Sequence, residues 1–167
     1  MNQRPKLTDI NIRTQLRPGD IGYVTYLHGK LYAKEYNYNI NFEAYVAAGL
    51  QEFFMNYDPN RSRVWVAEHQ QKIVGFILLM DRDDSAQLRH FIILPEYRGI
   101  GLGKTLLDLY ITFLKESGYR SSYLWTTKEL HEAAHLYTKY GFKLVEEKKS
   151  VRFGKPVIEQ KYELIIS

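Results

Sequence analysis

Three glycines at alternate positions, flanked by basic side chains, form the segment of this sequence best suited to bind a ligand. The segment reads Tyr97-Arg98-Gly99-Ile100-Gly101-Leu102-Gly103-Lys104-Thr105, after an apolar run and before a helical pattern. Glycine lets a backbone approach a ligand closely, and the first turn of a helix offers unpaired N–H groups and the positive end of the helix dipole. The pattern indicates a phosphate-binding loop, although the same glycines would also suit a tight strand-to-helix turn.

Two common nucleotide-binding patterns do not fit this segment. A Walker-type loop, G-x-x-x-x-G-K-[ST], would place its first glycine at position 98, which is Arg98. The dinucleotide pattern G-x-G-x-x-G would place its third glycine at position 104 or 106, which are Lys104 and Leu106. The pattern that remains is [QR]-x-x-G-x-[GA], which Arg98, Gly101 and Gly103 satisfy. A P-loop phosphotransferase is therefore disfavoured.

The composition predicts one folded domain of an enzyme or binding protein. The chain has 167 residues, 45% hydrophobic and 25% charged, so we expect one domain over residues 1–167 with a core over about residues 10–165. The net charge of +4 is scattered, which gives nucleic-acid binding no support. The absence of cysteine excludes disulfides, thiolate zinc sites and a cysteine nucleophile. Since no signal-peptide pattern or membrane-length apolar run occurs, we expect a cytoplasmic protein without membrane association.

Hydrophobic periodicity and turn residues predict a mixture of strands and helices. Asn11–Leu16 alternates like a strand, and Asp20 is expected to N-cap a helix that continues through Tyr36. The glycine-rich segment should open a helix that ends at Ser117-Gly118. These elements predict an α/β (α+β) fold, a mixed, mostly antiparallel sheet with helices packed on it. The other expected helices cover 42–57 and 129–140, and the other expected strands cover 63–68, 72–80, 86–94, 121–126, 142–149 and 157–165.

Two motifs in a fixed order carry a family resemblance. Residues Phe91–Gly103 match the form L-x-V-x-P-E-Y-R-G-x-G-x-G almost position for position, and Ala133–Phe142 completes the form A-x-x-L-Y-x-x-x-G-F. In both motifs, and in their separation, the sequence resembles the GNAT superfamily of acyl-CoA-dependent N-acyltransferases. The resemblance implies a single GNAT-like domain with a central sheet of about six or seven strands and about four flanking helices.

Four shorter segments are similar to the acetyltransferase half of bacterial proteins that fuse a MarR-type winged helix to a GNAT domain. They are Arg17–Gly22, Tyr32–Tyr36, Phe42–Ala44 and Leu124–Thr126. Because only a short stub precedes the first predicted strand, we expect the DNA-binding half to be absent. The asparagine usual at the start of the second motif is Leu130 here, as it also is in this subgroup.

The resemblance implies an N-acetyltransferase that moves an acetyl group from acetyl-CoA directly to a primary amine on a small molecule, a peptide or a protein lysine. No metal is expected, and dimers are common in the family. Tyr137 is expected to act as general acid toward the leaving thiolate. Backbone groups of Phe91 and Ile93 are expected to hold the pantetheine arm where their strand splays from its neighbour. The expected cofactor-binding residues are Phe91, Ile93, Arg98, Gly99, Ile100, Gly101, Leu102, Gly103, Lys104 and Thr105.

A non-catalytic acyl-CoA-binding sensor or regulatory module is the alternative function. The base that would take the proton of the amine also stays open, because its four candidates suit structural roles equally well. Strand alternation is expected to place His90 and Ile92 on one face of their strand, and Arg89, Phe91 and Ile93 on the other. The candidate bases are Glu68, His90, Glu35 and His28.

The remaining polar residues leave the acceptor undefined. His131 and His135 have the i, i+4 spacing of metal ligands but lack a third ligand in register, so we expect them to face solvent. The carboxylates Glu35, Glu43 and Glu52 would tolerate a cationic acceptor, or they could simply be helix surface.

Overall fold

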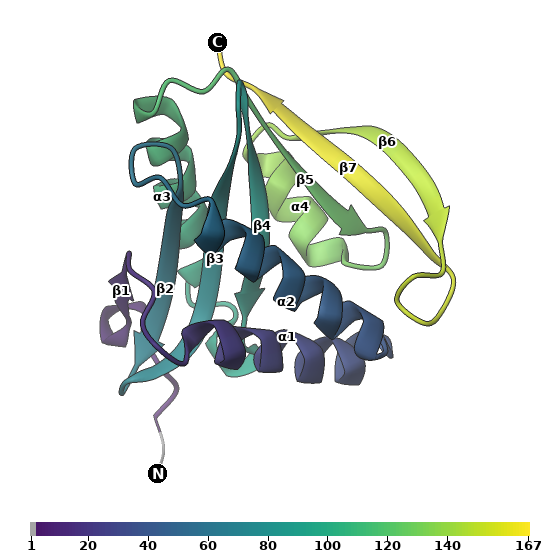
Figure 1. Cartoon of the computed structure of the whole chain (residues 1–167). Helices are drawn as coiled ribbons and strands as arrows, with labels where there is room; N and C mark the ends of the chain where they lie inside the picture. The colour runs from purple at the N-terminus through teal and green to yellow at the C-terminus, as the bar shows by residue number, and fades with distance from the viewer. Residues whose placement is uncertain (1–2) are drawn as a thin grey trace.

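Seven strands form one sheet in the order β1-β2-β3-β4-β5-β7-β6, with helices on both of its faces (Figure 1). The computed structural model describes residues 3–167. The predicted fold class, a mixed and mostly antiparallel sheet with four helices, is confirmed. The strands are β1 (Asn11–Arg13), β2 (Arg63–His69), β3 (Lys72–Arg82), β4 (Ser85–Ile93), β5 (Ser121–Thr127), β6 (Lys143–Ser150) and β7 (Val157–Ile165). The helices are α1 (Asp20–Tyr36), α2 (Ile40–Met55), α3 (Leu102–Glu116) and α4 (His131–Lys139), with short 3-10 turns at η1 (Leu7–Asp9) and η2 (Pro95–Tyr97).

The two central strands, β4 and β5, diverge along their length. They form the parallel pair of a sheet whose other pairs are antiparallel, and they are paired only from Ser85↔Ser121 to Gln87↔Tyr123. Beyond Gln87, β4 continues to Ile93 and β5 continues to Thr127 without pairing to each other. The splay expected next to Phe91 and Ile93 is therefore present.

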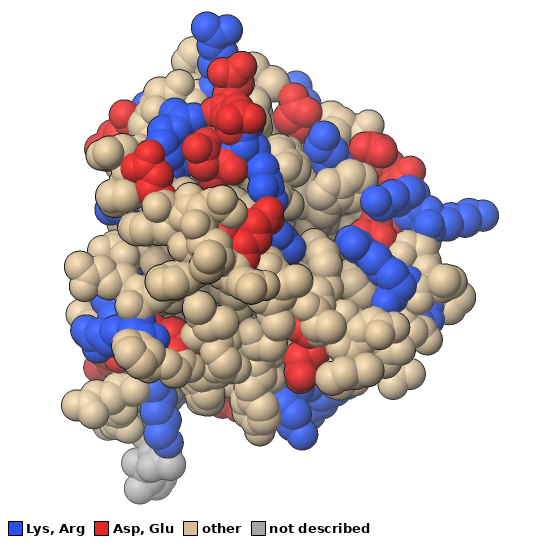
Figure 2. Space-filling view, in the orientation of Figure 1, with Lys and Arg blue, Asp and Glu red and all other residues tan. Residues whose placement is uncertain are grey.

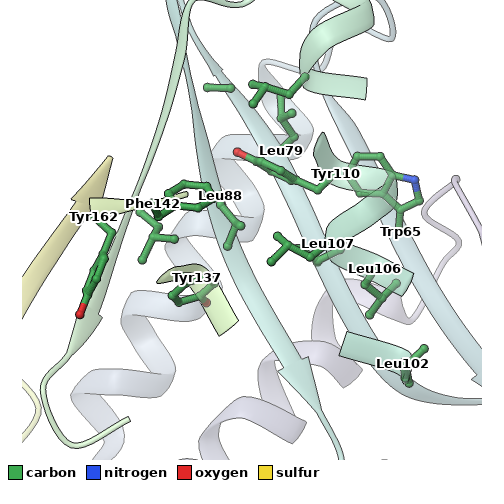
Figure 3. Close-up of a cluster of buried hydrophobic side chains, with 14 of the residues drawn as sticks. Trp65, Leu79, Leu88, Leu102, Leu106, Leu107, Tyr110, Tyr137, Phe142 and Tyr162 are labelled. Carbon is green, nitrogen blue, oxygen red and sulfur yellow. The ribbon is translucent and has the colours of Figure 1, made fainter. Parts of the chain in front are cut away.

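Each face of the sheet packs against its own pair of helices. Along β2, Val64 and Val66 join the cluster under α1 and α2, whereas Trp65 and Ala67 join the cluster under α3 and α4. This alternation is the period of a strand buried on both faces. Figure 3 shows the second cluster, in which the α3 side chains pack on the sheet beside Tyr137 of α4. Its labelled members are Trp65, Leu79, Leu88, Leu102, Leu106, Leu107, Tyr110, Tyr137, Phe142 and Tyr162.

The start of α1 differs from the prediction. Gly19 is the N-cap, with φ +95°, and Asp20 is the first helical residue. A left-handed N-cap favours glycine, and the Asp20 carboxylate is instead held inside the first turn. It accepts the Arg17 N–H at 2.7 Å and two hydrogen bonds from the Arg13 guanidinium at 2.7 and 2.9 Å. The strand β1 ends at Arg13 rather than at Leu16.

A β-bulge in β4 also overturns the expected alternation. Phe76 pairs with Ile92 while Leu78 pairs with Arg89, so one residue of β3 opposes two of β4, and His90 has φ +57°. A bulge turns two successive side chains toward one face. Arg89 and His90 both face α2, since a Cβ added to Gly49 would lie 2.7 Å from Arg89 Nη2 and from His90 Cε1. Strict alternation had predicted that Arg89 would share a face with Phe91. This prediction is wrong, because Arg89 faces α2 together with His90.

The surface charges are mixed in sign. Figure 2 shows Lys and Arg side chains interspersed with Asp and Glu, around a broad uncharged area over α1 and α2. The exposed apolar side chains there include Tyr26, Ile40 and Met55. Within residues 3–167, no helix combines the length and the hydropathy that crossing a membrane requires.

Candidate active site

The glycine-rich segment connects the end of β4 to the first turn of α3. Gly99 and Gly101 have φ +77° and +92°, and Gly101 is the N-cap of α3. The first backbone donor of the helix that finds a partner is Thr105 N–H, which bonds the Gly101 carbonyl at 3.0 Å. Among residues 3–167, the six successive N–H groups from Gly99 to Lys104 have no partner. Six free donors at the positive end of a helix dipole form a site for an anion.

The basic and hydroxyl side chains of this loop are largely engaged by the protein itself. Lys104 Nζ pairs with Asp108 at 3.0 Å, one turn along α3, and its side chain is 73% exposed. Thr105 Oγ1 donates to the Gly101 carbonyl at 3.0 Å. Arg98 donates to Glu35 of α1 at 2.8 and 3.3 Å, which ties the loop to that helix. The backbone therefore supplies most of the free donors, while Leu102 is buried and Ile100 packs on the core to anchor the loop.

A further basic residue, which no sequence motif indicated, lies at this loop. Arg4 donates from Nη2 to the Arg98 carbonyl at 3.0 Å, and a Cβ on Gly99 would lie 3.1 Å from the same nitrogen. Leu7 lies close by, because a Cβ on Gly101 would lie 3.6 Å from its Cδ2 atom. No local pattern could reveal this contact, since Arg4 and Arg98 are 94 positions apart.

A first cavity, of about 480 Å³, extends from this loop between β4 and α4. Its lining includes Gly99 and Gly103 of the loop, Phe91 and Ile93 of β4, and Leu136 of α4. Gly103 allows the close approach of these elements, since a Cβ there would lie 3.2 Å from Ile93 Cδ1 and 3.5 Å from Leu136 Cδ2. The cavity is thus a groove that leads from the anion site to the splay of the sheet.

The backbone of β4 presents free polar groups to this groove. Alternate residues of an antiparallel strand bond to the same neighbour. Because Leu94 donates its N–H to the Val74 carbonyl of β3 at 2.9 Å, the backbone groups of Ile93 and Phe91 point the other way. On that side β5 has already diverged from β4. The Ile93 carbonyl accepts a hydrogen bond from Arg98 Nε at 3.3 Å.

A second cavity, of about 120 Å³, adjoins the first at the splay. Both are lined by Tyr32, Phe91, Leu130 and Ala133, so the two cavities meet beside β4. The second cavity is lined mainly by aromatic side chains from the α1–α2 connection, α2, β5 and the β6–β7 connection, together with two histidines and two arginines. These are Tyr38, Phe42, Tyr45, Trp125, Phe153, His28, His90, Arg89 and Arg152.

Tyr137 lies at the inner end of this second cavity. Its side chain is 5% exposed and packs against Phe91, with ring centroids 6.2 Å apart, and against Phe142. Its hydroxyl makes no hydrogen bond among residues 3–167. Burial, and next the negative charge that Tyr32 would carry, raise the pKa of Tyr137 well above its usual value. The phenol is therefore a proton-bearing donor with no partner, although it gives up its proton less readily than an exposed tyrosine.

The structure separates the four candidate bases. Glu68 forms an ion pair with Arg13 at the edge of the sheet and lines neither cavity. Glu35 lines the first cavity, but its carboxylate forms an ion pair with Arg98. His28 and His90 both line the second cavity, with ring centroids 5.8 Å apart. His28 Nδ1 contacts the Val24 carbonyl at 2.8 Å, and His90 Nε2 contacts the Val46 carbonyl at 3.2 Å. The other ring nitrogens, His28 Nε2 and His90 Nδ1, are buried and find no hydrogen-bond partner in residues 3–167.

Both of these histidines are held neutral. Burial lowers the pKa of His28 to about 4, against a small opposing effect of its contact with Val24. Burial, then repulsion by His28 and Arg89, lowers the pKa of His90 well below its usual value. By contrast, His131 and His135 are exposed on α4, as expected. Within residues 3–167, no group of three or more His, Asp or Glu side chains is placed to hold a metal ion.

Comparison with known proteins places this chain in a family. Residues 30–142, more than half of the chain, match the acetyltransferase (GNAT) family. The chain is 39% identical over 79 residues to a [ribosomal protein bS18]-alanine N-acetyltransferase of Haemophilus influenzae, covering 47% of this chain and 53% of that protein. It is 32% identical over 101 residues to the uncharacterized N-acetyltransferase YjgM of Escherichia coli, covering 58% and 60%. The matches thus span little more than half the length of these relatives.

Solved structures share the fold over nearly the whole chain. A GNAT acetyltransferase of Staphylococcus aureus superposes with a TM-score of 0.75 at 21% identity, over 95% of this chain and 99% of that one. A GNAT acetyltransferase of Elizabethkingia anophelis, solved with acetyl-CoA bound, superposes with a TM-score of 0.65 at 15% identity, also over 95% and 99%. Because the family match covers residues 30–142, which include the glycine-rich loop and Tyr137, this chain belongs to the GNAT family of acetyltransferases.

Proposed function

We propose that this protein is an N-acetyltransferase that moves the acetyl group of acetyl-CoA directly to a primary amine. One observation carries the proposal: a groove lined by Gly99 and Gly103 of the loop with free backbone donors meets a second, aromatic cavity at the splay between β4 and β5. Such a pair of cavities brings two substrates together at one point. Direct transfer also agrees with the absence of cysteine, which rules out a cysteine thioester intermediate.

In this proposal acetyl-CoA lies in the first cavity. Its pyrophosphate accepts hydrogen bonds from the backbone of Gly99–Lys104, and Arg4, Arg98, Lys104 and Thr105 lie around it. The pantetheine arm follows β4 and bonds the backbone of Phe91 and Ile93, in place of the missing pairing with β5. The acetyl-CoA bound in the Elizabethkingia anophelis relative supports this choice of cosubstrate.

The chemistry then takes place where the two cavities meet. The amine nitrogen attacks the thioester carbonyl carbon, the new N–C bond forms and the C–S bond breaks. A free N–H of β4 stabilises the negative charge that develops on the carbonyl oxygen. Tyr137 donates its hydroxyl hydrogen bond to the leaving sulfur, while a neutral imidazole of the His28–His90 pair takes the amine proton, directly or through water. The proton taken from the amine then passes through water to the leaving sulfur, so the free thiol and the acetamide are the products.

A non-catalytic acyl-CoA-binding module is the second candidate, and one experiment separates the two. The affinity for acetyl-CoA is measured by calorimetry, and thiol release from acetyl-CoA is followed with a broad panel of amines. Binding together with amine-dependent thiol release supports the enzyme. Binding without release across the whole panel supports the module, and absence of binding contradicts both.

Three finer assignments belong to the same proposal. We assign the whole chain to one GNAT domain, whose core extends over about residues 10–165. We take the segment likeness to MarR-fused acetyltransferases as a hypothesis about the subgroup of this chain. We also treat a homodimer as a hypothesis, which light scattering of the purified protein would test.

A further inference from the structure

Arg89 carries a positive charge that the protein compensates only in part inside the second cavity. Its side chain is only 11% exposed, and among residues 3–167 its guanidinium makes no hydrogen bond. Arg89 forms a long ion pair with Glu52, in which Nη1 lies 3.6 Å from Oε1. Glu52 gives its two oxygens to Arg82, at 3.0 and 2.8 Å, and this hydrogen bonding lowers the pKa of Glu52 below its usual value. One carboxylate thus faces two guanidinium groups, and Arg89 is the unsatisfied one.

The other charges of this cavity cancel or are absent. Arg152 Nη2 pairs with Oε1 of the buried Glu159 at 2.5 Å. His28 and His90 are neutral, as described above. Of the three carboxylates expected from the sequence to tolerate a cationic acceptor, Glu52 bonds Arg82, Glu35 bonds Arg98, and Glu43 lines neither cavity. The net charge that faces the cavity is therefore positive.

Aromatic rings surround this positive charge. The guanidinium groups of Arg89 and Arg152 both lie over the Tyr45 ring, with their Cζ atoms 5.0 and 4.6 Å from the ring centroid. Phe42 and Phe153 contact each other and Tyr45, and Trp125 lines the opposite side from β5. A guanidinium removed from water is costly unless an anion pairs with it, and a carboxylate can pair with it through two parallel hydrogen bonds.

We infer that the acetyl acceptor is a small amino acid-type molecule, with an apolar or aromatic side chain and a carboxylate that binds Arg89. The inference rests on the proposed function. The carboxylate pairs with the free donors of Arg89, the side chain packs among the rings, and the amine reaches the junction at Phe91 and Ala133, where the acetyl group is transferred. An acceptor without the carboxylate leaves Arg89 buried and unpaired, so the cavity discriminates against it.

The test compares acceptors that differ only in the carboxylate. Thiol release is measured with phenylalanine and phenethylamine, with tyrosine and tyramine, and with leucine and isoamylamine. We expect a higher kcat/KM for the amino acid of at least one pair. Arg89→Gln should lower kcat/KM for that amino acid by about tenfold to a hundredfold, because hydrogen bonds to charged groups are lost, and should leave the value for the matching amine nearly unchanged. Arg89→Lys, which keeps the charge without the planar fork, should lie between the two.

The control variant is Arg63→Gln, which removes a guanidinium packed over the Phe113 ring outside both cavities. It should leave the discrimination intact. Binding is measured as well, by calorimetric titration of N-acetylphenylalanine or N-acetylphenethylamine into the protein in the presence of CoA. Equal kcat/KM within every pair, equal losses on both members in Arg89→Gln, or no binding of any carboxylate would each overturn the inference. Failure of the proposed function would appear separately, as absent acetyl-CoA affinity or absent thiol release with every amine.

Discussion

Tyr137 illustrates how burial sets the role of one side chain. Its ring is fixed among Phe91, Phe142 and Tyr162, while its hydroxyl has no partner in the described part of the chain. The raised pKa keeps the phenol protonated throughout the physiological range. A strong hydrogen bond to the leaving thiolate is thus favoured over complete transfer of the proton.

Tyr137→Phe should accordingly lower turnover more than it lowers affinity. The substitution keeps the packed ring and removes only the donor to the sulfur, so we expect kcat to fall by about tenfold to a hundredfold. The Kd for acetyl-CoA, measured by calorimetry, should change by less than about twofold. An equal loss in kcat and in affinity would show that the tyrosine serves packing alone.

His90 has a backbone requirement as well as a ring. Its φ of +57° is a conformation that asparagine tolerates better than most residues, so His90→Asn removes the imidazole with little backbone strain. If the His28–His90 pair takes the amine proton, kcat should fall by about a hundredfold while acetyl-CoA affinity is retained. Unchanged kcat in single-turnover measurements would exclude His90 from proton transfer.

Among the secondary-structure elements, most of the proposed cofactor contacts lie in the loop that joins β4 to α3. Gly101 combines a left-handed backbone with the N-cap position of α3, and it belongs to the run of unpaired N–H groups. Gly101→Val should therefore weaken acetyl-CoA binding at least tenfold, because a β-branched residue strains this conformation and shields the donors.

Gly19 offers a matched control for this substitution. It is also a left-handed N-cap, with φ +95° against +92° for Gly101, but it opens α1 and is not part of the glycine-rich loop. Gly19→Val should cost a similar free energy of unfolding, of about 1–3 kcal/mol, and leave the Kd for acetyl-CoA unchanged. If both variants lose affinity equally, the effect is general destabilisation rather than loss of an anion site.

The same elements show what the sequence could and could not predict. The glycine spacing and the apolar run before it were enough to place a strand, a loop and a helix, because these signals are local. The bulge at His90 was missed, since alternation assumes a regular strand and the bulge depends on pairing with β3. The contact of Arg4 with the loop, and the shared carboxylate of Glu52 between Arg82 and Arg89, depend on positions far apart in the chain. No periodicity encodes such contacts.

At the scale of the whole molecule, the layer of helices α1 and α2 packs on the sheet through two buried histidines whose pKa values are lowered. His28 of α1, 3% exposed, packs edge-on against His90 of β4. Both have a pKa lowered by burial, and Arg89 adds repulsion next to His90. Protonation of either ring would place a charge between the two layers, so the unfolded chain binds protons more readily than the folded one.

The stability of the fold should consequently fall on acidification before the carboxylates titrate. With a pKa of about 4 in the folded state and about 6.5 in the unfolded state, the contribution of His28 is complete above pH 6.5 and is lost as the pH falls toward 4. Between about pH 7.5 and pH 5 the free energy of unfolding should drop by about 2 kcal/mol through His28, and His90 adds in the same direction. Urea denaturation at the two pH values measures this drop. His28→Phe should reduce it, whereas His135→Phe, at an exposed position of α4, should leave it unchanged; an equal drop in wild type and His28→Phe would show that acid acts elsewhere in the molecule.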